Sequence, residues 1–140
     1  MDFKHKSLVA SCDKLYEDFD YKSKGLEPRI DYLFEVKTNA GTVIGNWYFS
    51  GLPGCCGVVV SHGLYLKEEY RGMKLSGPMQ ELREAVARKL GYSAMLATVV
   101  TNNFAEVISS AKHGWKLGPT FKNKERTGNE IAFQIKLLNL

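Results

Sequence analysis

The sequence predicts an α/β fold in which six strands and three helices form one domain over residues 1–140. Three observations predict it: segments with alternating apolar residues, segments with apolar residues spaced by three or four, and breaks containing glycine or proline between them. The 140 residues are 44% hydrophobic and 24% charged, a balance that suits one globular domain able to bury a core.

The first predicted element is an amphipathic helix that begins at Ser7 and ends by Gly25 and Pro28. Ser7 is a residue type that caps helices. The apolar positions recur at helical spacing: Leu8, Cys12, Leu15 and Phe19. The acidic residues Asp13, Glu17, Asp18 and Asp20 outnumber Lys14 here, so an acidic surface is expected.

Three strands are predicted next, at about residues 30–37, 42–50 and 57–66. The first alternates apolar and polar residues, and Asn39-Ala40-Gly41 supplies a turn to the second. Gly51-Leu52-Pro53-Gly54 breaks the chain before the third. Short breaks of this kind join antiparallel neighbours.

The second half alternates helices with strands. A helix from Pro78 to Gly91 carries the apolar stripe Met79, Leu82, Val86 and Leu90. Because it leads from one strand to another, at residues 94–100, that pair of strands must be parallel. A helix over 104–111 and two strands at about 116–122 and 130–137 follow.

Tyr70-Arg71-Gly72-Met73-Lys74-Leu75-Ser76-Gly77 is the most informative motif, because it joins a predicted strand to a predicted helix. Backbone amides in a glycine-containing turn of this kind can hold the phosphates of a cofactor. Such turns also serve tight packing alone. Two neighbouring blocks favour phosphate binding: Gly63-Leu64-Tyr65-Leu66-Lys67-Glu68-Glu69 upstream, and Asn103 with Lys112-His113-Gly114-Trp115 downstream.

This order of blocks resembles the GNAT superfamily of acetyl-CoA-dependent N-acetyltransferases over about residues 30–137. Arg71 matches the start of the family pattern Arg/Gln-x-x-Gly-x-Gly/Ala, whereas Lys74 and Ser76 replace its glycines. The resemblance implies a mixed sheet of six or seven strands, with a central parallel pair splayed for the cofactor, flanked by three to four helices. Residues 1–6 are the candidate for a seventh strand.

The resemblance also implies that the chain binds acetyl-CoA. The residues that match the family's cofactor site are Leu64, Tyr65, Leu66, Arg71, Gly72, Met73, Lys74, Leu75, Ser76, Gly77 and Asn103. The strand residues would act through their main chain, which in the family binds the pantetheine arm and stabilises the oxyanion. Lys74 must either avoid a positive φ angle or bear a cost of about 1 kcal/mol. Asn103 is also a residue type that caps helices.

For catalysis, His62 is the candidate base that takes the proton from the attacking amine. Glu35, Asp31 or a water chain are alternatives, and a histidine in a strand can simply belong to the core. The family often has a tyrosine general acid four residues before the closing glycine, and that position is Ser110. A water relayed through Ser110, or Tyr65, could protonate the leaving thiolate instead.

The function expected from the resemblance is transfer of an acetyl group from acetyl-CoA to a primary amine by direct attack in a ternary complex. The acceptor is a small molecule, a protein lysine or a protein N-terminus. The alternative is a GNAT-like module that binds acetyl-CoA or a protein without turnover. A nucleic-acid-binding domain ranks last, because only the basic segment with Lys112, Lys116, Lys122, Lys124 and Arg126 supports it.

The remaining expectations concern cellular location, the cysteines, metal binding and the oligomeric state. The net charge is +4, and no apolar run approaches the length of a membrane span, so a cytoplasmic protein without a membrane partner is expected. Cys12, Cys55 and Cys56 are an odd number poorly placed for disulfides or zinc, so reduced thiols and no metal are expected. Many family members dimerise, and a homodimer through the C-terminal strands would fit.

Overall fold

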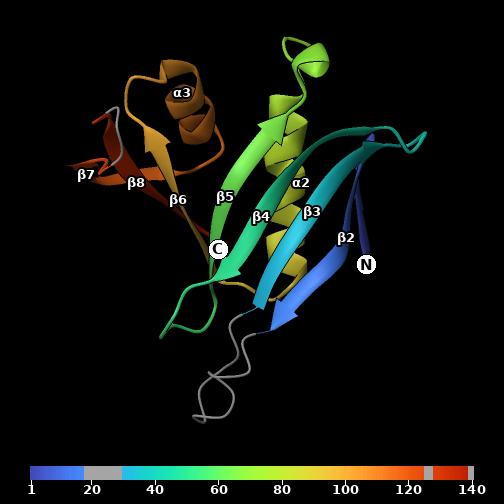
Figure 1. Ribbon diagram of the computed structural model, residues 1–140, viewed down its shortest axis with the longest axis horizontal. Coiled ribbons are helices and arrows are strands. Elements are labelled where there is room, and N and C mark those ends of the chain that lie inside the picture. The colour runs from blue at the N-terminus through green and yellow to red at the C-terminus, as the bar shows by residue number, and fades with distance from the viewer. Residues whose placement is uncertain (18–29, 125–127, 139–140) are drawn as a thin grey trace.

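The computed structural model describes residues 1–17, 30–124 and 128–138. Figure 1 shows strands, helices and one short 3₁₀ helix in this order: β1 (Asp2–His5), β2 (Leu8–Glu17), β3 (Ile30–Thr38), β4 (Val43–Gly51), β5 (Val58–Leu66), η1 (Glu68–Tyr70), α2 (Ser76–Lys89), β6 (Ala94–Val100), α3 (Phe104–Lys112), β7 (Lys116–Lys122) and β8 (Glu130–Leu137).

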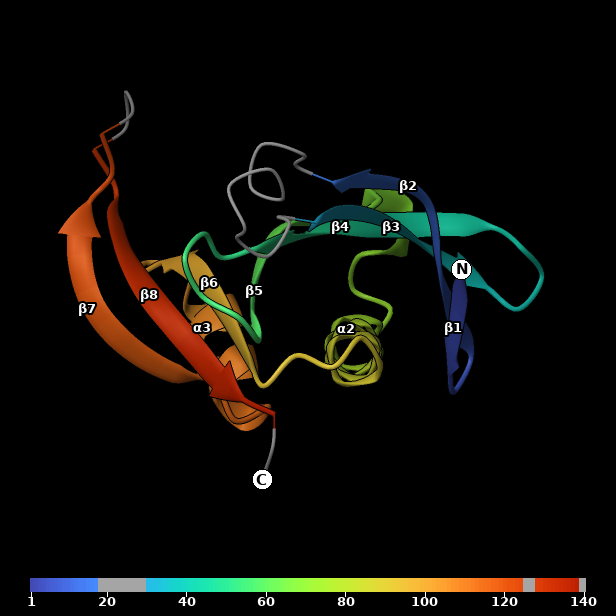
Figure 2. The ribbon, with the colours of Figure 1, turned by 90° about the horizontal axis from the view of Figure 1, so that it is seen from below.

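The strands form one sheet with the order β1-β2-β3-β4-β5-β6-β8-β7. Consecutive strands from β1 to β5 are antiparallel, and β5 and β6 are parallel, as the intervening helix α2 requires. Figure 2 shows α2 and α3 on the same side of the curved sheet. The two helices therefore flank the point at which the parallel pair lies.

The core lies between α2 and the inner face of the sheet. Phe34 on β3 and Trp47 on β4 are fully buried and stack with ring centroids 4.9 Å apart. Leu82 and Val86 of α2 are also fully buried in this cluster. Alternation along the strands and a stripe along the helix place these side chains on facing surfaces, and their burial stabilises the fold by about 2 kcal/mol each.

The predicted first helix is wrong. Residues 8–17 form β2, which pairs with β1 on one side and β3 on the other. Leu8, Ala10 and Cys12 are buried with the period of a strand. The register shifts between Cys12 and Lys14, which leaves Asp13 as an extra residue. Such a bulge changes the phase of the alternation, so spacings of four and then three residues fit a bulged strand as well as a helix.

The strand and helix counts therefore differ from those expected. Residues 2–5 form the additional strand β1, and β2 stands in place of a helix, so the sheet has eight strands instead of six or seven. The described residues contain two α-helices, against three to four predicted. Neither is long and apolar enough to cross a membrane. Every other predicted strand and helix is confirmed to within about two residues.

The two charged segments are only partly described. Asp13 is exposed at the bulge of β2, while Asp18 and Asp20 lie outside the described residues. In the basic segment, Lys116, Lys122 and Lys124 are exposed, and Arg126 lies outside the described residues. Among the described acidic residues, Asp13 and Glu17 therefore lie on a strand and not on the predicted helix.

Candidate active site

The parallel strands β5 and β6 separate after a short paired stretch. They pair only from Val58 to Val60 on β5, opposite Ala94 to Leu96 on β6. Beyond this point β6 continues along β8 and β5 continues along β4, and Figure 1 shows the two strands diverging toward their carboxyl ends. The main-chain groups of residues 61–66 that face away from β4 thus have no strand partner within the described residues.

A cavity of about 270 Å³ lies in this opening. Its lining comes from both separated strands, from both helices and from β8: Ser61, His62, Gly63, Leu64, Arg83, Ala97, Thr98, Val99, Val100, Asn103, Glu106 and Gln134. The splayed parallel pair expected from the sequence is therefore confirmed, together with a cavity at its fork.

A β-bulge in β5 turns the strand at the fork. Asn46 lies opposite Tyr65 and Tyr48 opposite His62, so two residues of β5, Gly63 and Leu64, face one residue of β4. Gly63 has a φ of 63°, and a Cβ there would lie 2.6 Å from the Tyr48 ring. The Asn46 side-chain amide donates to the Gly63 carbonyl at 3.3 Å. The bulge thus needs glycine for its φ angle and for space.

His62 is an exposed residue on the sheet face opposite α2, and so it does not belong to the core. Its ring stacks on Tyr48, with centroids 5.4 Å apart and planes 15° apart. Its Nε2 atom lies 2.9 Å from the Ser50 hydroxyl. Asp31 and Glu35 lie opposite Ser50 and Asn46 on the neighbouring strand. The structure therefore brings all three candidate bases to one face of the sheet.

The loop before α2 contains two residues with positive φ angles and is largely exposed. Gly72 has a φ of 76° with open space where a Cβ would lie, and Lys74 has a φ of 58°, so it does adopt the positive angle. Leu75 precedes the helix and supplies no side-chain cap. The first amides of α2 are thus left for another acceptor. Met73, Lys74 and Ser76 are exposed, so the loop is open to a ligand.

The other residues predicted at the cofactor site lie along the path from this loop to the fork. The Arg71 Nε atom donates to the Leu66 carbonyl at 2.8 Å, and its guanidinium lies 5.4 Å from the centroid of the Tyr65 ring. Leu64 and Leu66 are half-buried against the core. Gly77 faces His113 of the α3 terminus, since a Cβ on Gly77 would lie 4.0 Å from the imidazole Nε2 atom. The start of α2 therefore lies beside the end of α3.

Comparison with known proteins shows what this geometry resembles. No protein-family model matches the sequence, and no curated protein matches it either. Solved structures do match. A chimera of the spermidine N-acetyltransferase of Vibrio cholerae and hSSAT superposes with a TM-score of 0.70 at 11% identity, over 77% of this chain and 67% of that one.

Two further structures agree. One is described as a putative phosphinothricin N-acetyltransferase, with a TM-score of 0.68, 19% identity, and coverage of 78% of this chain and 69% of that one. The other is an IAA acetyltransferase from Bacillus cereus, with a TM-score of 0.67, 11% identity, and coverage of 77% and 78%. The chain has the GNAT fold. It spans about two thirds of the length of the first two structures.

In this GNAT fold Asn103 has two roles. Its side chain accepts from the Glu106 amide at 3.3 Å and so caps α3, and the residue also lines the cavity. The capping role and the site role of Asn103 are therefore compatible. Ser110, by contrast, is only 2% exposed, does not line the cavity, and has a hydroxyl without a hydrogen-bond partner in the described residues. His62 reaches the cavity and Ser110 does not.

Arg83 is the cavity residue that sequence reasoning missed. It lies on α2 within the apolar stripe, four residues after Met79 and three before Val86, and it is 4% exposed. A charge at a buried helical position was the signal available in the sequence. Burial lowers the pKa of the Arg83 guanidinium to about 10, while Glu106 and Glu84 act in the opposite direction. The side chain remains a cation at neutral pH.

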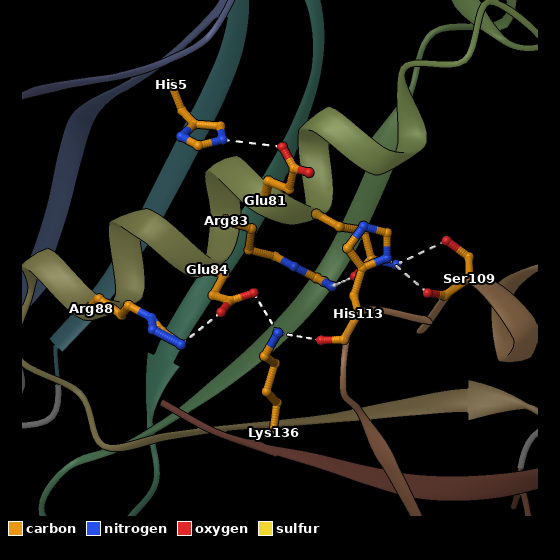
Figure 3. Close-up of polar contacts among 9 residues, drawn as sticks. His5, Glu81, Arg83, Glu84, Arg88, Ser109, His113 and Lys136 are labelled. Atoms are coloured by element: carbon orange, nitrogen blue, oxygen red, sulfur yellow. Dashed lines mark hydrogen bonds and ion pairs between the residues drawn. The ribbon is translucent and has the colours of Figure 1, made fainter. Parts of the chain in front are cut away.

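A polar network ties the two helices to the sheet beside the site. Lys136 of β8 pairs with Glu84 of α2 and donates to the His113 carbonyl at the end of α3 (Figure 3). Glu84 also pairs with Arg88 at 2.8 Å. Lys136 therefore links α2 to the end of α3. Within the described residues, no group of His, Cys, Asp and Glu is arranged to hold a metal ion.

Proposed function

We propose that the chain is an N-acetyltransferase that transfers an acetyl group from acetyl-CoA to a primary amine. The observation that carries the proposal is the fork between β5 and β6, where a bulged strand, a cavity and an uncapped helix start lie along one path. The GNAT fold of the solved acetyltransferases supports it.

The amides of residues 71–77 would hold the pyrophosphate of coenzyme A, because the positive end of α2 and its uncapped amides favour an anion there. Lys74 would add a charge that partly offsets its backbone strain. Gly72 leaves open space, so that the main chain can approach the phosphates closely. The main chain of this loop therefore suits a pyrophosphate, and no side-chain chemistry is required.

At the fork, the unpartnered main chain of β5 would bind the pantetheine arm as an added strand would. The Leu64 amide at the bulge is the proposed oxyanion donor. His62, held by Tyr48 and Ser50, would accept the proton of the attacking amine, with Glu35 and Asp31 as alternatives on the same face. Acetyl-CoA supplies the activated acyl group, and direct attack needs no covalent enzyme intermediate.

The acceptor is proposed to be a primary amine of a small molecule, a protein lysine or a protein N-terminus. Spermidine is named for one structural neighbour, and the exposed Tyr48 ring beside Glu35 and Asp31 would suit a cationic amine. A homodimer through the C-terminal strands stays a prediction. It is supported by β7, an edge strand beside exposed apolar side chains such as Phe121 and Phe133.

Calorimetric titration with acetyl-CoA, coenzyme A and ATP tests the cofactor, and a panel of amines with thiol detection tests turnover. We expect acetyl-CoA and coenzyme A to bind more tightly than ATP, and Gly72→Glu to abolish binding through bulk and charge. Retained affinity in Gly72→Glu would refute the assigned loop. Binding without thiol release on any amine would favour the alternative, a GNAT-like module that binds acetyl-CoA without turnover, which the departures at Lys74, Ser76 and Ser110 support.

A further inference from the structure

Arg83 carries a buried charge that Glu106 and Glu84 influence but that no carboxylate of the described residues contacts directly. One terminal nitrogen donates to the Ser61 hydroxyl at 3.0 Å and the other to the Gln80 side-chain carbonyl at 3.0 Å. The Nε atom has no partner, and within the described residues Arg83 forms no ion pair. A guanidinium has five N–H donors, so most of its hydrogen-bonding capacity is unused. A buried cation in this state normally has an anionic partner.

The position of Arg83 matches the level at which a bound thioester would lie. Arg83 is seven residues from the start of α2, or about 10 Å along the helix axis. The bulge at Gly63 is three residues from Leu66, which is about 10 Å along β5. The hydrogen bond to Ser61 shows that the guanidinium reaches β5 two residues, or about 7 Å, before Gly63. Both residues line the same cavity.

Among the described residues that line the cavity, Arg83 is the only lysine or arginine. Glu84 on the same helix is engaged by Lys136 and Arg88. Glu106 on α3 is the carboxylate among the residues that line the cavity, and His62 of β5 lines it as well. The Trp115 ring packs against Arg83, with 5.3 Å from the guanidinium to the ring centroid. Figure 3 shows the Arg83 side chain extending from α2 toward Ser109 and His113.

We propose that Arg83 stabilises the negative charge that develops on the leaving sulfur of the acyl donor. In the step concerned, the amine nitrogen bonds to the thioester carbon, and the carbon–sulfur bond breaks with its electron pair on sulfur. The proton of the amine goes to the base on the His62 face. Arg83 keeps its own protons and balances the thiolate, which water protonates after release. The Ser110 hydroxyl is buried and does not reach the cavity, so Arg83 stabilises the leaving group electrostatically in its place.

This inference rests on the proposed function, and the thiol pKa of bound coenzyme A tests it without any amine acceptor. Ultraviolet absorbance of the thiolate is followed against pH in complexes of the full chain, with desulfo-coenzyme A subtracting the protein's own absorbance. We expect the thiol pKa to lie below that of free coenzyme A, and Arg83→Met to raise it by about one unit or more.

Arg83→Lys keeps the charge and should hold the thiol pKa low. Ser61→Ala is the matched control, because it removes the hydrogen bond to β5 but keeps the guanidinium, so it should also leave the thiol pKa low. Glu106→Gln removes the carboxylate that lines the cavity and should lower the thiol pKa further.

The outcomes separate the two proposals. Failure of the wild-type chain to bind coenzyme A sinks the proposed function and this inference with it. Binding with a wild-type thiol pKa no lower than that of free coenzyme A overturns the role of Arg83 alone, even if Arg83→Met does not fold. An equal thiol pKa of bound coenzyme A in wild type and Arg83→Met would also overturn the role of Arg83 alone.

Discussion

Gly63→Ala should destabilise the protein and distort the site, because two separate costs meet at this residue. The φ of 63° is one that alanine adopts at a cost of roughly 1 kcal/mol. The added Cβ would also lie 2.6 Å from the Tyr48 ring, where 3.4 Å is the short end of ordinary contact. Displacing a ring that is stacked on His62 costs a further 1–3 kcal/mol, roughly.

Gly41→Ala is the matched control. Gly41 has a φ of 88° but nothing within 4 Å of its Cβ position, so alanine there meets the backbone cost alone. Denaturant unfolding of both variants measures the difference, which we expect to be about 1–3 kcal/mol in the direction of a less stable Gly63→Ala. Adding Tyr48→Ala to Gly63→Ala should remove most of this difference in unfolding free energy. Equal stability of the two glycine variants would refute the reasoning about the Tyr48 contact.

The other predictions concern the candidate base His62, the ion pairs of Glu84 with Lys136 and Arg88, and the half-buried phenol of Tyr92. His62→Gln should lower turnover about a hundredfold while leaving coenzyme A affinity unchanged by calorimetry, and unchanged turnover would exclude His62 as base. Lys136→Met should cost about 2 kcal/mol of unfolding free energy, because the Lys136 side chain is only 13% exposed and Glu84 stays charged. Arg88→Met should cost under about 1 kcal/mol, because the Arg88 side chain is 42% exposed. Equal losses would contradict this. Burial raises the pKa of Tyr92 to about 12 from 10.0, so stability present below pH 10 should fall as the pH rises toward 12. Tyr92→Phe should flatten that fall in alkaline unfolding curves, and an unchanged slope would argue against it.

Local patterns were enough to predict most elements of the fold. From Ile30 onward, alternation, helical stripes and turn residues predicted every strand and both α-helices to within about two residues. The same blocks located the loop before α2, where Lys74 adopts the positive φ angle that was one of the two alternatives for it. These features depend on residues near one another in the chain, so the sequence records them directly.

The N-terminal segment and the bulge could not be assigned in the same way. Whether residues 8–17 are helix or strand depends on pairing with β3 across the chain, and a bulge at Asp13 blurs the period that would have distinguished them. Likewise, the exposure of His62 and the withdrawal of Ser110 from the cavity follow from which face each element turns to its neighbours.

From residue 30 onward, the sequence by itself determined the order of the elements, the loop at the start of α2 and the parallel crossover, because each follows from local backbone preference and hydrophobic period. Only the tertiary structure decided that β2 is a strand, that β5 bulges at Gly63 beyond the fork, and that Arg83 is buried beside the cavity without an ion-pair partner in the described residues. The physical reason is that pairing, burial and charge compensation depend on residues far apart in the chain. Their positions exist only once the sheet and helices have packed.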